Sequence, residues 1–110
     1  MFTQQQKDSL KRQLVSCLEG EKEVRRIVIF GSFLELSDPH DLDVAVFQDS
    51  SEKYLPLAMR YRKKTRAIAC IIPLEIIPLK AEGGSGLFMD EIAQGEVIYE
   101  SSDERQQVRF

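Results

Sequence analysis

The sequence is poor in several residue types that mark common protein classes. It has no tryptophan, one histidine and two cysteines in 110 residues, and its 18 acidic residues outnumber its 15 lysines and arginines, giving a net charge of −3. This composition disfavours a disulfide-stabilised secreted domain and a protein that binds nucleic acid through a general positive field. We therefore expect the two cysteines, Cys17 and Cys70, to be buried free thiols.

Long apolar segments are also missing. No apolar run approaches the roughly 20 residues that are needed to cross a bilayer. The first residues, MFTQQQKDSLKRQ, are too polar for a signal peptide. These two observations predict a cytoplasmic protein without a membrane partner.

What the chain does have is enough apolar material for one core. A hydrophobic content of 43% over 110 residues predicts a single domain at 1–100, and the polar end at 101–110 is predicted to be a flexible tail. The predicted elements are helix 3–19, strand 23–30, strand 41–47, a helix within 52–66, strand 67–79, helix 85–95 and strand 96–100. Because only a loop separates the first two strands, the fold class is α+β (α/β) with a mixed sheet.

Local patterns support these elements. Leu10, Leu14, Cys17 and Leu18 are spaced to form one apolar stripe on the first helix. The prolines at 73 and 78 place the strand 67–79 at a sheet edge or at a bulge, since proline lacks the N–H that a central strand requires.

Two carboxylates, Asp41 and Asp43, open the apolar strand DLDVAVF. Residues two apart in a strand point to the same face, so two like charges would repel each other there. One reading is that Asp41 only ends the loop and Asp43 caps a neighbouring group. The other reading is that a divalent cation, Mg²⁺ by its preference for oxygen ligands, lies between the carboxylates.

Two further features make the second reading stronger. Gly31 and Ser32 end the preceding strand, where glycine permits positive φ and close approach of the backbone to a phosphate. Glu75 is the one charge in IIPLEIIPL, and a lone buried Glu is costly. Glu75 lies either on a solvent-facing edge or beside Asp41 and Asp43 as a third metal ligand.

The segment GSFLELSDPHDLDVAVF resembles the Gly-Ser-x(n)-Asp-x-Asp signature of the DNA polymerase beta nucleotidyltransferase superfamily. The short chain looks like a minimal nucleotidyltransferase (MNT) domain of that superfamily. The similarity continues through PLEIIPL and GLFMDEIAQGEVIYE and spans residues 23–100.

The resemblance implies a nucleotidyltransferase fold, a small mixed sheet flanked by helices. It implies that Gly31 and Ser32 bind an NTP, taken to be ATP, and that Asp41, Asp43 and Glu75 are catalytic residues that bind two Mg²⁺ ions. It also implies transfer of a nucleoside monophosphate to a hydroxyl on a HEPN-type partner protein, with this chain as the antitoxin of a toxin–antitoxin pair.

Two alternatives stay open. Glu35 and Leu36 stand where many MNT domains have Arg and Gly, and Glu75 replaces the commoner Asp, which favours a catalytically degenerate module that acts as a protein-binding antitoxin subunit. The basic run RYRKKTR at 60–66 suggests a nucleic-acid-binding domain, but the net charge disfavours it and a solvated helix face is the expected role.

Overall fold

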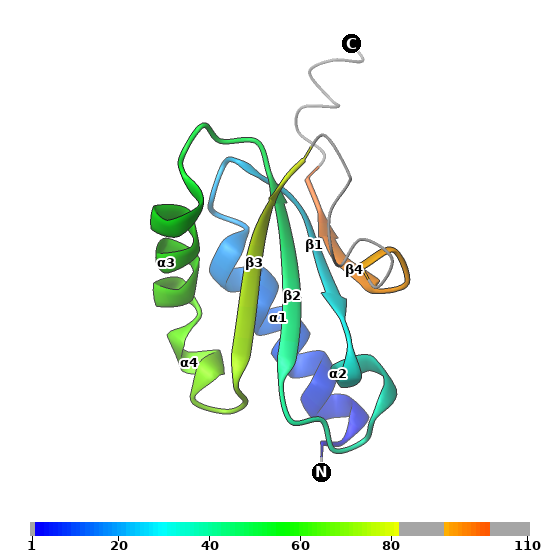
Figure 1. Ribbon diagram of the computed structural model, residues 1–110. Helices are drawn as coiled ribbons and strands as arrows, with labels where there is room; N and C mark the ends of the chain where they lie inside the picture. Colours follow the sequence, from blue (N-terminus) through cyan, green and yellow to red (C-terminus); the bar gives the residue numbers. More distant parts are fainter. Residues whose placement is uncertain (1, 82–91, 102–110) are drawn as a thin grey trace.

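The computed structural model describes residues 2–81 and 92–101 (Figure 1). In chain order its helices and strands are α1 (Gln4–Leu18), β1 (Val24–Phe30), α2 (Ser32–Glu35), β2 (Leu42–Gln48), α3 (Tyr54–Lys64), α4 (Arg66–Ala69), β3 (Leu74–Lys80) and β4 (Glu96–Glu100). In this part of the chain no helix is long and apolar enough to span a membrane.

The strands form one sheet in the order β3-β2-β1-β4. β1 is antiparallel to β2 and to β4, whereas β2 is parallel to β3. The predicted mixed sheet of an α+β fold is therefore confirmed. β3 is an edge strand, which is one of the two placements predicted from Pro73 and Pro78. Proline is tolerated at an edge, because half of the N–H groups there have no partner strand to bond to.

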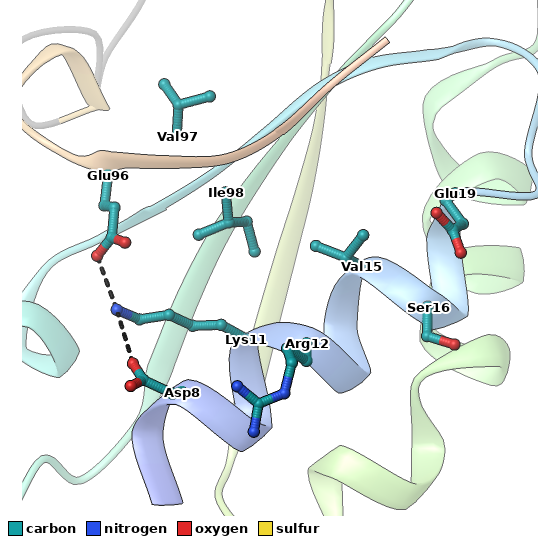
Figure 2. A pocket seen from close by; sticks show the side chains of 9 residues that line it. All are labelled: Asp8, Lys11, Arg12, Val15, Ser16, Glu19, Glu96, Val97 and Ile98. Carbon is teal, nitrogen blue, oxygen red and sulfur yellow. Dashed lines mark hydrogen bonds and ion pairs between the residues drawn. The ribbon is translucent and has the colours of Figure 1, made fainter. Parts of the chain in front are cut away.

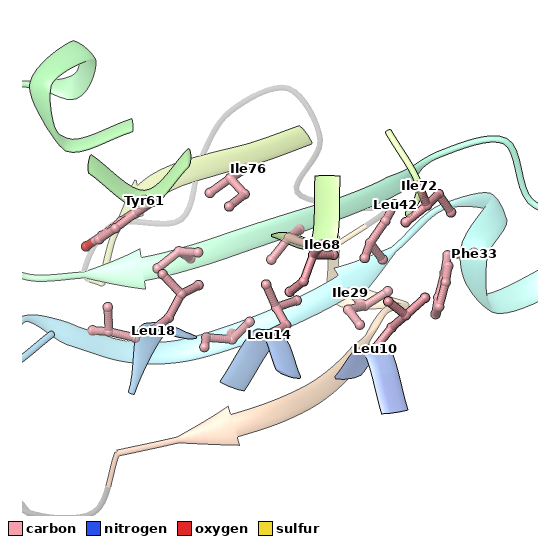
Figure 3. Close-up of a cluster of buried hydrophobic side chains, with 14 of the residues drawn as sticks. Leu10, Leu14, Leu18, Ile29, Phe33, Leu42, Tyr61, Ile68, Ile72 and Ile76 are labelled. Carbon is pink, nitrogen blue, oxygen red and sulfur yellow. The ribbon is translucent and has the colours of Figure 1, made fainter. Parts of the chain in front are cut away.

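The main core lies between α1 and one face of the sheet. Thr3 begins α1 with a capping box, in which its hydroxyl accepts from the Gln6 N–H and the Gln6 side chain accepts from the Thr3 N–H. The predicted stripe buries Leu10, Leu14 and Leu18. Figure 3 shows these leucines against side chains from the strands and from α3 and α4, among them Tyr61, Ile68 and Ile76.

The predicted strand at 67–79 is wrong in its first half. Residues 66–69 form α4, and β3 begins only at Leu74. Ile68 and Ile72 are buried while Cys70 and Ile71 between them are exposed, which is the four-residue spacing of a helical turn and not the alternation of a strand. The Ile72 N–H accordingly donates to the Ile68 carbonyl at 3.1 Å.

The same helical turn corrects the prediction of two buried thiols. Both cysteines are free, but Cys70 is exposed at the end of α4 and Cys17 is half-buried on α1. Each of these helices buries only one of its faces against the core. A cysteine that lies away from that face therefore keeps some or all of its exposure to water.

The other face of the sheet carries a smaller apolar cluster built from Val28, Phe30, Ala45, Phe47 and Ile92. The predicted helix at 85–95 lies largely outside the described residues, and so does the predicted tail after Ser101. Ser101 itself is buried, and its N–H donates to the Arg25 carbonyl at 2.8 Å.

Candidate active site

Gly31 connects the end of β1 to α2 in a conformation that other residues avoid. Its φ of 83° and ψ of −157° fall in a region that is essentially restricted to glycine, and it is the one positive-φ residue in the described part of the chain. A Cβ atom at this position would lie 2.7 Å from Asp43 Oδ2. The absence of a side chain therefore lets the Asp43 carboxylate approach the backbone at the start of α2, where Ser32 is the first residue.

The two aspartates lie at the start of β2 in different environments. Asp41 is the residue before β2 and is exposed, whereas Asp43 lies within β2 and is half-buried. Leu42 and Val44, which flank Asp43, point into the main core, while Ala45 belongs to the cluster on the opposite face. The predicted alternation is confirmed, so the face that carries Asp43 is the face opposite α1.

Glu75 lies directly beside Asp43. The two residues are register partners in the parallel pairing of β2 with β3, and neighbouring strands lie about 4.8 Å apart. Glu75 is exposed, so the structure combines both predicted placements: an edge position and a carboxylate next to the Asp-x-Asp strand. In residues 2–81 and 92–101, no three His, Cys, Asp or Glu side chains are grouped so that they could hold a metal ion.

Lys7 supports the turn that follows Gly31 and Ser32. Its Nζ donates to the Phe33 carbonyl at 2.7 Å and to the Leu36 carbonyl at 2.6 Å, and it lies 5.2 Å from the centre of the Phe33 ring. A cation at these carbonyls satisfies acceptors that α2 leaves unpaired at its C-terminal end. No sequence pattern indicates this contact, because Lys7 is 26 residues away from Phe33.

Arg60 and Lys64, two of the basic residues in the run at 60–66, belong to an ion-pair network. The Arg60 guanidinium donates to Glu21 at 2.9 Å, to Glu23 at 2.8 Å and to Glu52 at 2.7 Å. The Tyr61 hydroxyl donates to the same Glu23 carboxylate at 2.8 Å. This network fixes α3 against the segment between α1 and β1.

The network shifts the pKa of three of its members. The hydrogen bond to Glu52 outweighs burial and raises the pKa of Arg60, and burial followed by the hydrogen bond to Glu23 raises the pKa of the Tyr61 hydroxyl. Burial also raises the pKa of the Glu21 carboxyl, but hydrogen bonds from Lys64 and Arg60 outweigh it and the pKa is lowered overall.

A hollow lies between α1 and β4, away from the candidate site. Val15, Val97 and Ile98 contribute apolar surface to it, and Lys11 reaches Glu96 at 2.8 Å across it (Figure 2). It contains none of the carboxylates at 41, 43 and 75. We therefore place the candidate active site at the start of β2 and not in this hollow.

Comparisons with known proteins identify the family of the chain. A family model described as polymerase beta, nucleotidyltransferase, matches residues 12–104, which include every predicted site residue. No curated protein matches the chain. The chain belongs to the polymerase beta nucleotidyltransferase family.

Two solved structures share its fold. One is the complex of tri-AMPylated HEPN toxin from Shewanella oneidensis with MNT antitoxin, with a TM-score of 0.64 and 12% identity over 92% of this chain and 78% of that chain. The other is the MntA–HepT toxin–antitoxin complex, with a TM-score of 0.61 and 12% identity over 91% of this chain and 78% of that chain. The chain is thus similar in fold to MNT antitoxin structures.

Proposed function

We propose that this chain transfers a nucleoside monophosphate from an NTP, ATP in the first instance, to a hydroxyl group on a partner protein. One observation carries the proposal: Asp43 and Glu75 are register partners on adjacent strands, and Asp43 lies against Gly31. Gly31 and Ser32 form the turn at which the phosphates are expected to bind, called here the phosphate-side turn. Family membership supports the reaction class.

The residues of the site have separable roles in this reaction. Gly31 leaves room for a polyphosphate beside the backbone, and Ser32 supplies a hydroxyl at the start of α2. In the transfer, the acceptor oxygen forms a bond to the α-phosphorus, the bond from that phosphorus to its bridging oxygen breaks, and pyrophosphate leaves. In this proposal the proton of the acceptor hydroxyl passes to one of the paired carboxylates, Asp43 or Glu75.

The carboxylates are of the right kind for Mg²⁺. This ion is held in proteins by one or two carboxylates together with substrate phosphates and waters. Asp43 and Glu75 are suitable protein ligands for such a site, and exposed Asp41 lies two residues before Asp43. Bound Mg²⁺ would neutralise phosphate charge and lower the pKa of the acceptor hydroxyl. We propose two Mg²⁺ ions, each bound by one or two of these carboxylates together with substrate phosphates and waters, because no three carboxylates of the described residues are grouped to hold an ion by themselves.

The proposed acceptor is a HEPN-type protein, with this chain as its antitoxin. The Shewanella complex contains a HEPN toxin that carries AMP groups, and the fold of this chain resembles that complex's MNT antitoxin. A domain of this size offers little room for a second substrate module, which supports an acceptor hydroxyl on another molecule.

A second candidate function is a protein-binding antitoxin subunit without catalytic activity. Glu35 and Leu36 favour it, because an acidic residue and an exposed leucine follow the phosphate-side turn. A carboxylate there would repel a triphosphate, and an exposed leucine is suited to a protein contact.

The test measures ATP binding by calorimetry, with Mg²⁺ and with EDTA, alongside transfer of labelled nucleotide to a co-purified HEPN-type partner. Asp43→Asn should abolish Mg²⁺-dependent ATP binding. Glu75→Gln should keep binding but lower transfer by about 10²-fold or more, the scale on which lost transition-state electrostatics usually appears.

Glu100→Gln is the matched control, since Glu100 is also an exposed glutamate on an edge strand. It should leave both measurements unchanged. Equal ATP binding by wild type and Asp43→Asn would contradict the proposed site. ATP binding without any transfer by wild type would favour the protein-binding subunit.

A further inference from the structure

The segment 54–71, which contains α3 and α4, exposes several large apolar side chains. Six large hydrophobic side chains are exposed in the described residues, and four of them lie between positions 54 and 71: Tyr54, Leu55, Met59 and Ile71. Met59 lines a hollow of 670 Å³ together with Arg62, Lys63 and Arg66. We call the side chains of Leu55, Met59, Arg62, Lys63 and Arg66 the basic–apolar surface.

The cations of this surface differ from the other basic residues of the same run. Arg60 and Lys64 are paired with carboxylates of the chain itself. Arg62, Lys63 and Arg66 form no ion pair within residues 2–81 and 92–101. Three unneutralised cations therefore gather beside exposed apolar side chains on a chain whose net charge is −3, and local charge of this kind selects an acidic partner.

The spacing of the surface indicates the shape of that partner. Leu55, Met59 and Arg62 follow one another at intervals of four and three residues on α3, so they form one ridge. The helix has 11 residues and is about 16 Å long. A second helix packs along such a ridge more readily than an extended strand does.

The surface lies beside the strand that carries Glu75, on the α1 side of the sheet. Leu74 lines the same hollow and packs against the main core, while Glu75, the next residue of β3, lies on the opposite face with Asp43. The Pro73 carbonyl accepts from the Leu42 N–H at 2.9 Å, which joins the loop after α4 to the start of β2. Figure 1 shows α4 and the start of β3 at the same end of the molecule as α2.

We propose that the basic–apolar surface docks an acidic amphipathic helix of a partner protein. The partner's carboxylates pair with Arg62, Lys63 and Arg66, and its apolar stripe covers Leu55 and Met59. Nucleic acid fits less well, because a phosphate backbone offers nothing apolar to cover these two side chains. That the docked protein is also the acceptor rests on the proposed function, whereas docking itself does not.

The test uses a labelled synthetic peptide of about 18 residues, or about five helical turns, with leucines on one stripe and glutamates elsewhere. Fluorescence anisotropy measures its affinity for the full chain, beside the same peptide with Gln for Glu and a single-stranded RNA of similar length. The acidic peptide should bind more tightly than both, and its affinity should fall as salt rises.

Arg62→Glu combined with Lys63→Glu should weaken peptide binding about ten-fold or more, because two ion pairs with the peptide's glutamates become repulsive contacts. Arg12→Glu combined with Lys22→Glu is the control, because it changes the net charge equally at two exposed positions of another surface. It should change the affinity less than about two-fold. Met59→Asp tests the apolar part and should also weaken binding.

If both double variants lost the same affinity for the acidic peptide, the loss would come from net charge alone, and the proposal would be overturned. Tighter binding of the RNA, lost with Arg62→Glu and Lys63→Glu, would make the surface a nucleic-acid site instead. Calorimetry with ATP and Mg²⁺ on the same samples separates the two proposals. Peptide binding without ATP binding would refute only the proposed function. ATP binding without peptide binding would refute only the proposed docking.

Discussion

Replacing Gly31 with alanine should cost both stability and ligand binding, for two reasons that add. The backbone at φ 83° and ψ −157° lies where a residue with a side chain is strained by about 1–3 kcal/mol. The new Cβ would also lie 2.7 Å from Asp43 Oδ2, so the carboxylate would have to retreat to at least the 3.4 Å of ordinary contact. Together these predict a loss of about 2–3 kcal/mol in the free energy of unfolding.

Urea denaturation measures the loss, and thermal unfolding should show a melting temperature about 8–12 °C lower. Gly20→Ala is the matched control: Gly20 is exposed, a Cβ there meets nothing within 4 Å, and its φ is not positive. That change should be neutral or stabilise by up to about 1 kcal/mol. If the proposed site is correct, Gly31→Ala should also weaken ATP binding, because Asp43 has to move.

A double-mutant cycle separates the two causes. In an Asp43→Ala background the carboxylate is gone, so Gly31→Ala should cost only its backbone strain and the coupling should amount to about 0.5 kcal/mol or more. Equal stability of Gly31→Ala and Gly20→Ala would refute both the predicted strain and the predicted clash at Gly31. An identical cost in both backgrounds would refute the contact with Asp43 alone.

Three further predictions concern the ionic contacts. Arg60→Met should lower the free energy of unfolding by about 2 kcal/mol in urea titrations, because half-buried Glu21 and Glu23 lose their shared cation; an equal loss with the exposed Arg12→Met would contradict this. The lowered pKa of Glu21 contributes stability that is present above its ordinary value of 4.5 and is lost as pH falls through the folded-state value, so urea midpoints at neutral and acid pH should differ more in wild type than in Glu21→Gln. Lys7→Met should cost about 1 kcal/mol by urea denaturation, since two carbonyls lose a charged donor, and Lys7→Arg should restore part of it; no loss at all would show that Lys7 does not support the turn.

Local residue patterns were enough to specify part of the fold. The stripe at Leu10, Leu14 and Leu18 specified α1, and strict alternation after Asp41 specified which face of β2 carries Asp43. Gly31 marked the positive-φ turn, because few other residues tolerate that conformation. The family signature is also local, so it was visible before any tertiary contact.

Tertiary structure decided what local pattern leaves open. A short apolar run such as 67–72 suits a helix as well as a strand, and only the packing of Ile68 and Ile72 under the sheet selected α4. The pairing of Asp43 with Glu75 is set by the register of β2 with β3, which joins residues far apart in the chain. Likewise, RYRKKTR reads as uniformly basic, and only the folded positions of the glutamates at 21, 23 and 52 neutralise Arg60 while leaving Arg62 and Lys63 without a partner in the described chain. Ion pairs and register depend on distances in space, and a linear sequence does not contain those distances.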